Sequence, residues 1–143
     1  MQLDEKDKAI ISALRRNSRY SIREIGKITG IRPSTVHQRI KKLVQTGVIE
    51  RFTVKLNNKE VNENFIVFML VKGETSNYIT KKFIQNKFVR EIFGVTGEFD
   101  VIMKLKFSDI EEFNKFIMDF RKQLPAVYST VTMVVTTTIK EEL

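Results

Sequence analysis

The sequence contains no cysteine and no tryptophan, and it has a single histidine, His37. Without cysteine the chain can form neither a disulfide nor a thiolate metal site, and it has no cysteine nucleophile. A Ser-His-Asp triad would have to use His37, and a metal site would have to consist of carboxylates alone. We therefore expect a protein that is not an enzyme and that uses no metal or other cofactor.

Long apolar runs are also missing, because no stretch approaches the roughly 18 apolar residues of a membrane-spanning helix. The first ten residues, MQLDEKDKAI, are charged and lack the apolar centre of a signal peptide. Hydrophobic residues make up 42% of the 143 residues and charged residues 29%, which is ordinary for one or two small globular domains. We expect a cytoplasmic protein.

Positive charge is present in excess, and it is confined to one part of the chain. Residues 1–60 contain 14 lysines and arginines against six acidic residues, whereas residues 61–143 contain 11 of each kind. The whole net charge of +8 therefore belongs to the first part. A polyanionic partner for that part is the simplest explanation, and a merely solubilising basic surface is the alternative.

The basic part has the pattern of three short helices. Apolar residues at helical spacing predict helices over residues 3–16, 21–29 and about 34–46. Ser21 and Glu24 have the S-x-x-E spacing of a capping box at the start of the second helix. The segment TGIRPS then predicts a tight turn, and the three helices together indicate a helix-turn-helix.

The third helix has one apolar face and one polar, mostly basic face. Val36, Ile40 and Leu43 share the apolar face, which we expect to pack on Leu14, Ile25 and Ile28. In a helix-turn-helix the beginning of this helix reads base edges in the major groove of DNA. The residues that we expect to contact DNA are Arg32, Ser34, Thr35, His37, Gln38, Lys41, Lys42 and Arg51.

These residues divide into two kinds of contact. The amide of Gln38 can pair with adenine, and a Ser or Thr hydroxyl can serve several bases. Arginines and lysines suit phosphates, which position a protein without specifying sequence. For His37 a base contact and a side chain that merely points to solvent or phosphate remain equal alternatives.

The rest of the chain alternates between strand and helix patterns. VIERFTVKLN, residues 48–57, predicts a short ribbon or wing, followed by a hinge near residues 58–64. Beyond it the order is β-α-β-β-α-β, the split βαβ arrangement of ferredoxin-like folds. We predict an α+β protein with a helix-turn-helix domain over residues 1–60 and a ferredoxin-like domain over residues 61–143. The strands are expected at 65–73, 89–97, 99–107 and 127–140, and the helices at 76–88 and 109–124.

Three segments together resemble the Lrp/AsnC (feast/famine) family of transcriptional regulators. LDEKDKAIISAL is similar to the opening helix of that family, and NSRYSIREIGKITGIRPSTVHQRIKKLVQTGVI resembles its DNA-binding signature. VTGEFDVIMKL resembles the strand, Gly-x-x-Asp loop and strand of its effector domain. The resemblance covers essentially the whole chain in the right order, and departs from the family at Ala126, where Gly is more common.

The resemblance implies dimers that form through the C-terminal sheets and assemble further into tetramers, octamers or open helices. It also implies an amino-acid effector at a dimer–dimer interface. Gly97 would let backbone N–H groups approach a carboxylate and Asp100 would hold an ammonium, although both residues also suit an ordinary turn. The effector-binding residues implied are Thr96, Gly97, Glu98, Phe99, Asp100, Thr130 and Thr132.

Two other functions stay open at this point. One is an architectural protein that organises DNA with little sequence preference and no ligand. The other, more remote, is an enzyme, because siroheme decarboxylases share a similar two-domain architecture. Such enzymes commonly use histidine near the C-terminal sheet, and residues 61–143 contain none.

Overall fold

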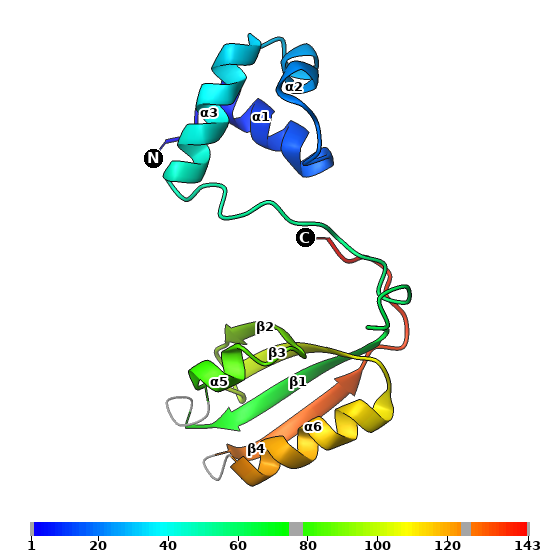
Figure 1. Cartoon of the computed structure of the whole chain (residues 1–143). Helices are drawn as coiled ribbons and strands as arrows, with labels where there is room; N and C mark the ends of the chain where they lie inside the picture. The colour runs from blue at the N-terminus through cyan, green and yellow to red at the C-terminus, as the bar shows by residue number, and fades with distance from the viewer. Residues whose placement is uncertain (1, 75–78, 124–126, 143) are drawn as a thin grey trace. The chain divides into compact units, whose positions relative to one another are not determined.

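The structure is a computed structural model that describes residues 2–74, 79–123 and 127–142. The chain divides into two compact units, Met1–Val54 and Lys55–Leu143. The first unit is helical, and the second is built on a four-stranded sheet (Figure 1). Within the described ranges, no helix of either unit is long and apolar enough to cross a membrane.

Three helices make up the first unit, as predicted: α1 (Glu5–Arg16), α2 (Ile22–Thr29) and α3 (Pro33–Gln45). The capping box of α2 is confirmed, because the Glu24 N–H donates to the Ser21 hydroxyl while the Ser21 N–H donates to the Glu24 carboxylate. Gly30, at a φ of 70°, ends α2 in the left-handed conformation that glycine adopts without strain. The buried core of the unit consists of Ile10, Ala13, Ile25, Ile31, Val36 and Leu43.

One expected core residue of this unit lies at the surface. Ile28 is 52% exposed, so its predicted contact with the apolar face of α3 is wrong. The buried side of α2 contains Gly26 instead, because the turn between α2 and α3 packs there. A Cβ atom on Gly26 would lie only 2.9 Å from the backbone oxygen of Ile31. The buried face is therefore rotated toward Gly26 and away from Ile28.

The ribbon predicted over residues 48–57 is absent from the described chain, because residues 50–57 form no helix or strand. The alternation leaves Phe52, Val54 and Leu56 exposed. A strand is stabilised by its hydrogen-bonded ladder to a neighbouring strand. No segment within the described ranges pairs with these residues, so the alternating sequence forms no strand.

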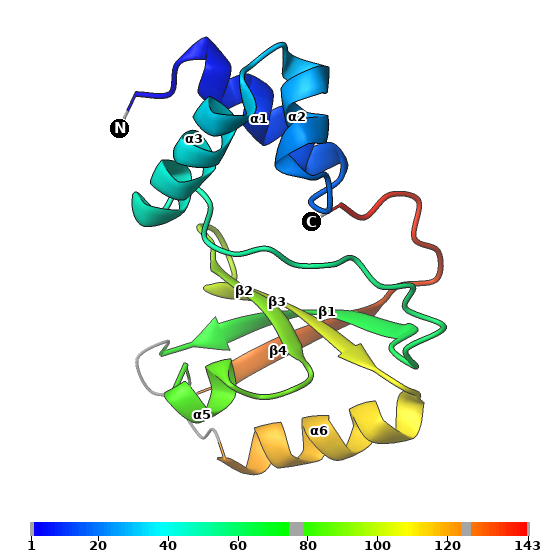
Figure 2. The same ribbon diagram turned by 45° about the horizontal axis from the view of Figure 1, so that its top comes forward.

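The second unit has the predicted β-α-β-β-α-β order. Its four strands form one antiparallel sheet in the order β2-β3-β1-β4, and Figure 2 shows both helices on the same face of that sheet. The elements are β1 (Phe65–Gly73), α5 (Lys81–Ile84), β2 (Val89–Gly94), β3 (Val101–Phe107), α6 (Ile110–Gln123) and β4 (Val127–Val134).

The core of this unit lies between the sheet and its helices. Every second residue of β3 is buried, and the alternate residues Val67, Met69 and Val71 of β1 lie beside them. Phe116 and Phe120 of α6 are buried against this layer, and Phe113 packs at its margin. These aromatic residues of α6 therefore belong to the core of the unit.

Helix α5 and strand β4 differ most in length from the prediction. Helix α5 covers four residues, of the helix predicted over 76–88, and residues 75–78 lie outside the described part. Asn86 ends it, because its side chain accepts a hydrogen bond from the Phe88 N–H in a local turn. Strand β4 ends at Val134 rather than at residue 140, where its pairing with Val67 of β1 ends, and one further hydrogen bond follows, from the Val135 N–H to the Ile66 carbonyl.

Candidate DNA interface and ligand domain

The polar face of α3 is open to solvent. Ser34 lies three and four residues before His37 and Gln38, and Lys41 lies four and three residues after them, which places all four on one side of the helix. All four are exposed. Among the described residues, none of their side chains makes a hydrogen bond or an ion pair. This face therefore presents a row of unengaged donors and one unpaired cation.

The other predicted contact residues border this face. Arg32 occupies the N-cap of α3, where its side chain makes no capping hydrogen bond, and it is exposed. Lys42 and Arg51 are exposed as well, and Thr35 is half-buried. The structure brings seven of the eight predicted residues together on or beside α3, whereas Arg51 lies in the extended segment that follows it.

Arg39 is the basic residue of α3 that has a different role. Its Nη1 lies 2.7 Å from both carboxylate oxygens of Asp4 and 2.8 Å from Oδ1 of Asp7, which is buried. The hydrogen bond from Arg39 lowers the pKa of Asp4 to about 2, with the Asp7 N–H contributing further. Arg39 therefore joins α3 to the start of α1 and faces away from the open surface.

The sequence contains a partial sign of this link between α1 and α3. Asp4 and Asp7 cap α1 reciprocally, each accepting a hydrogen bond from the backbone N–H of the other. Asp7 follows Leu3 by four residues and precedes Ile10 by three, which places it on the apolar side of the helix, where a carboxylate requires a cation. Several arginines compete for that role in the sequence, so the spacing alone does not select Arg39.

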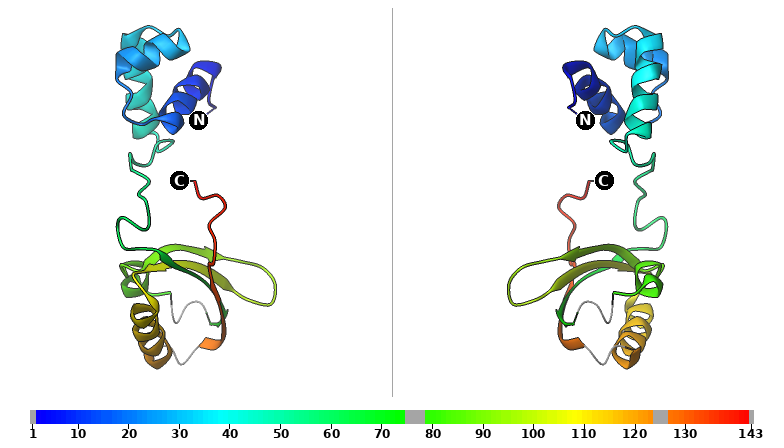
Figure 3. Two further views of the ribbon diagram at one scale, coloured as in Figure 1. Left: turned by 90° about the vertical axis from the view of Figure 1, so that its right-hand side faces the viewer. Right: turned by 90° about the vertical axis from the view of Figure 1, so that its left-hand side faces the viewer.

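The predicted effector loop connects β2 to β3 and projects from the end of the sheet, as Figure 3 shows. Gly97 has a φ of 127°, which is strained for any residue with a side chain. Asp100 fixes the base of the loop: its Oδ2 accepts a hydrogen bond from the Gly73 N–H at 2.9 Å, and its own N–H donates to Val71. Thr96, Gly97 and Glu98 are exposed, and Phe99 and Asp100 are half-buried.

The two predicted threonines lie on β4, across the sheet from the loop. Thr130 pairs with Val71, the residue whose carbonyl accepts from Asp100, so Thr130 and Asp100 border the same residue of β1. Thr132 pairs with Met69, two positions further along. The structure therefore brings Thr130 toward the base of the loop but does not bring Thr132 there.

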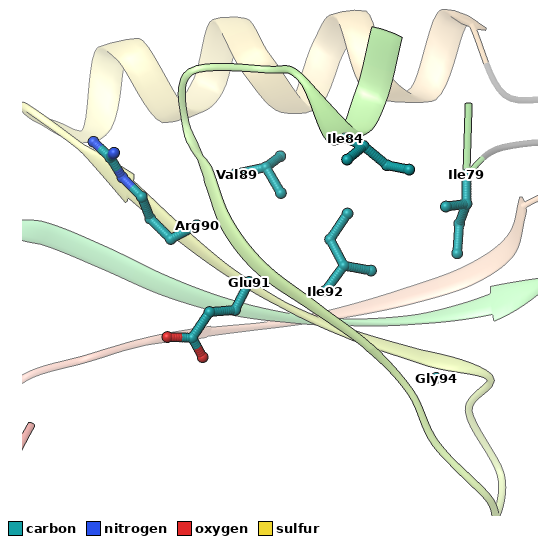
Figure 4. Close-up of a pocket in the computed structure, with 7 residues that line it drawn as sticks. All are labelled: Ile79, Ile84, Val89, Arg90, Glu91, Ile92 and Gly94. Carbon is teal, nitrogen blue, oxygen red and sulfur yellow. The ribbon is translucent and has the colours of Figure 1, made fainter. Parts of the chain in front are cut away.

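A shallow hollow of about 410 Å³ lies between α5 and β2 (Figure 4). Four aliphatic side chains form most of its lining, and Arg90 and Glu91 stand at its polar side. It reaches Gly94, where the effector loop begins. The remaining lining residues are Ile79, Ile84, Val89 and Ile92.

Both units match known families. Residues 3–50 match a family of winged helix-turn-helix DNA-binding domains, and residues 66–143 match the Lrp/AsnC ligand binding domain. The chain is 36% identical to the HTH-type transcriptional regulator FL11 of Pyrococcus abyssi, an alignment that covers 99% of this chain and 94% of the relative.

Two solved structures share the fold. One is a transcriptional regulator of Neisseria meningitidis in complex with L-methionine, with a TM-score of 0.91, 23% identity, and coverage of 99% of this chain and 94% of that one. The other is a feast or famine regulatory protein of M. tuberculosis complexed with L-methionine, with a TM-score of 0.88, 17% identity, and coverage of 98% and 96%.

The open face of α3 and the family matches define a DNA-binding regulator that carries a separate ligand-binding domain. The chain belongs to the Lrp/AsnC family of transcriptional regulators.

Proposed function

We propose that two copies of this chain bind a pseudo-palindromic DNA site and that an amino-acid effector modulates this binding. The observation that carries the proposal is the row of unengaged polar side chains on α3, in the unit that holds the entire excess of positive charge. A duplex supplies both the phosphates for the cations and the base edges for the short donors.

Within this interface, Ser34, Thr35, His37 and Gln38 read bases, because they occupy the beginning of α3, the part that enters the major groove. The four cations Arg32, Lys41, Lys42 and Arg51 neutralise phosphates. Each neutralised phosphate contributes about −0.9 to the slope of log K against log salt, so four in each of two copies give a slope of about −7.

The effector is proposed to bind at the loop of residues 96–100, with Thr130 contributing its hydroxyl. The regulators of Neisseria meningitidis and M. tuberculosis, which hold L-methionine, support an amino acid as the ligand class. Asp100 uses Oδ2 for the Gly73 N–H, and Oδ1 makes no hydrogen bond to any described residue. That oxygen can accept a hydrogen bond from a ligand ammonium.

Self-association is proposed to use the sheet face opposite the helices. Strand pairing places Phe68 beside Met133 and Leu70 beside Val131 on this face, and the two β4 side chains are more than 40% exposed. Covering such an apolar surface with a second copy removes it from water. This contact gives dimers, and the proposed tetramers or octamers need a second interface between dimers.

We propose that residues 1–60 bind DNA and include the hinge, and that residues 61–143 bind the ligand and form the contacts between copies. We propose that the protein works in the cytoplasm with the chromosome and is a regulator rather than an enzyme. The match of residues 3–50 to DNA-binding domains and the likeness to a transcriptional regulator support both statements.

The test is a footprint on the DNA upstream of the protein's own gene, in excess competitor DNA, with and without a mixture of amino acids. A discrete protected site with a period of one helical turn is expected, with its extent changed by the amino acids. Uniform coverage that ignores sequence and additives contradicts the proposal and favours an architectural role.

A further inference from the structure

The carboxylate of Glu141 forms the centre of a polar cluster on the sheet. Its Oε1 lies 2.5 Å from Nζ of Lys104 and 3.0 Å from Nζ of Lys106, both on β3. Its Oε2 accepts a hydrogen bond from the Asn58 amide at 3.3 Å, and Lys106 Nζ also donates to the Asn58 oxygen at 2.8 Å. One residue of the C-terminal segment thereby links a strand of the sheet to the segment that precedes β1.

The side chains of this cluster are poorly accessible to water. The exposed fractions are 14% for Lys104, 13% for Lys106 and 15% for Glu141. The two lysines hold the pKa of Glu141 at about 2, and Asn58 contributes further. Lys104 also lies 3.7 Å from Oε1 of Glu91 on β2, so loss of Glu141 leaves Lys104 with a second carboxylate but removes the carboxylate that Lys106 contacts.

Asn58 begins a compact turn that the cluster holds in place. The Glu63 N–H donates to the Asn58 carbonyl at 2.7 Å, and the Val61 N–H donates to the Asn57 carbonyl. The far end of the turn has its own attachment, because Glu63 forms an ion pair with Arg90 of β2. The turn is thus attached to the sheet at two points, and Glu141 supplies only the first of them.

The first attachment sets the length of the free tether between the units. Ile49 is still fixed to the helical unit, because its N–H donates to Leu43. With Asn58 held, only residues 50–57 are free, and eight residues reach at most about 27 Å when fully extended. Once Asn58 is released, opening of the backbone hydrogen bonds of the turn leaves Glu63 as the held residue, so residues 50–62 become free and the limit rises to about 45 Å.

The two tether limits differ by about 18 Å. This difference matters for DNA recognition, because it is close to half a turn of the double helix. We propose that Glu141 is a specificity-determining residue: by latching Asn58 to the sheet, it keeps the tether short and restricts the spacing of the two half-sites that a dimer accepts. This inference rests on the proposed dimeric binding of DNA. A linker that cannot span two sites reduces the effective concentration of the second binding unit to near zero, whereas a longer one restores it.

The experiment compares Glu141→Gln with Glu142→Gln in the full-length protein. Both substitutions remove one negative charge from neighbouring residues. Glu142 is a matched control because its side chain is 74% exposed and, among the described residues, pairs only with Lys140. The probes are a DNA duplex selected in vitro by the wild-type protein, the same duplex with five or ten base pairs inserted between the half-sites, and a single half-site.

Wild type and Glu142→Gln are expected to lose at least about tenfold in affinity when five base pairs are inserted, whereas Glu141→Gln loses less than about threefold. All three proteins bind the single half-site alike. Amide hydrogen exchange of Val61 and Glu63 rises in Glu141→Gln alone, while the amides of β3 stay protected.

An unchanged spacing profile and unchanged exchange in Glu141→Gln, with half-site binding intact, overturn the inference. Increased exchange throughout β3 also overturns it, because the residue then serves only to stabilise the sheet. If the wild-type protein selects no DNA, the proposed function fails, and the exchange measurement still decides whether Glu141 holds the turn.

Discussion

A single methyl group added at Gly26 tests how the recognition helix is placed. Gly26 lies in α2, facing the turn that leads into α3. In Gly26→Ala the new Cβ would lie 2.9 Å from the Ile31 carbonyl oxygen, and 3.4 Å from Cγ of Pro33. The first contact is closer than real Cβ atoms approach backbone, so the turn that carries α3 has to move.

Two effects of opposite sign determine the size of the change. Over-packing of this kind costs about 1–3 kcal/mol, whereas replacing glycine by alanine within a helix contributes about 0.5–1 kcal/mol of stability. We therefore expect the free energy of unfolding of the helical unit to fall by about 0.5–2 kcal/mol. For a small domain each 1 kcal/mol lowers Tm by about 4–8 °C.

The assay is thermal unfolding followed by the signals of the helical unit, together with DNA affinity at a temperature where the variant is folded. Gly94→Ala is the matched control, because nothing lies within 4 Å of the Cβ position there and the backbone is not left-handed. We expect Gly26→Ala to lower both the Tm of the helical unit and the DNA affinity, and Gly94→Ala to change neither. A Gly26→Ala protein as stable as wild type, with unchanged DNA affinity, would refute the close packing of this turn.

Three further predictions follow from the other sites. Gln38→Ala should weaken binding to the selected DNA but not to random DNA. Lys41→Ala should weaken binding to both DNAs and reduce the slope of log K against log salt by about 2 for a dimer. Equal losses for both variants on both DNAs would contradict this division between base and phosphate contacts. Gly97→Trp should abolish any response of DNA binding to amino acids while leaving that binding intact, and a variant that still responds normally removes the loop from the effector site. Because the pKa of Glu141 is lowered from 4.5 to about 2 by Lys104 and Lys106, its contribution to stability is complete above its unfolded value and is lost as pH falls through the folded one. The Tm difference between wild type and Glu141→Gln should therefore shrink between about pH 5 and pH 2, and a difference that persists at pH 2 is incompatible with this cause.

Local signals in the sequence were sufficient for most of the elements. The hydroxyl and carboxylate of Ser21 and Glu24 need only a neighbouring turn of chain to cap a helix, and the structure contains that cap. The alternation in β3 depends only on the geometry of a strand, which turns successive side chains to opposite faces. Element lengths were less predictable, because the extent of β4 depends on its pairing with β1, whose residues lie about 60 positions earlier in the chain.

The sequence by itself determined the order of the elements, the confinement of positive charge to the first part, and the polar face of α3. These features depend on composition and on the periods of helices and strands. Only the tertiary structure distinguished residues of the same type. It separates Arg39, which is bound to acids 35 and 32 residues away, from Lys41, which is free in the described chain. It likewise separates Glu141, which is bound to Lys104 37 residues away, from the exposed Glu142. The physical reason is that an ion pair depends on which side chains the folded chain brings within about 4 Å, and no local period encodes that distance.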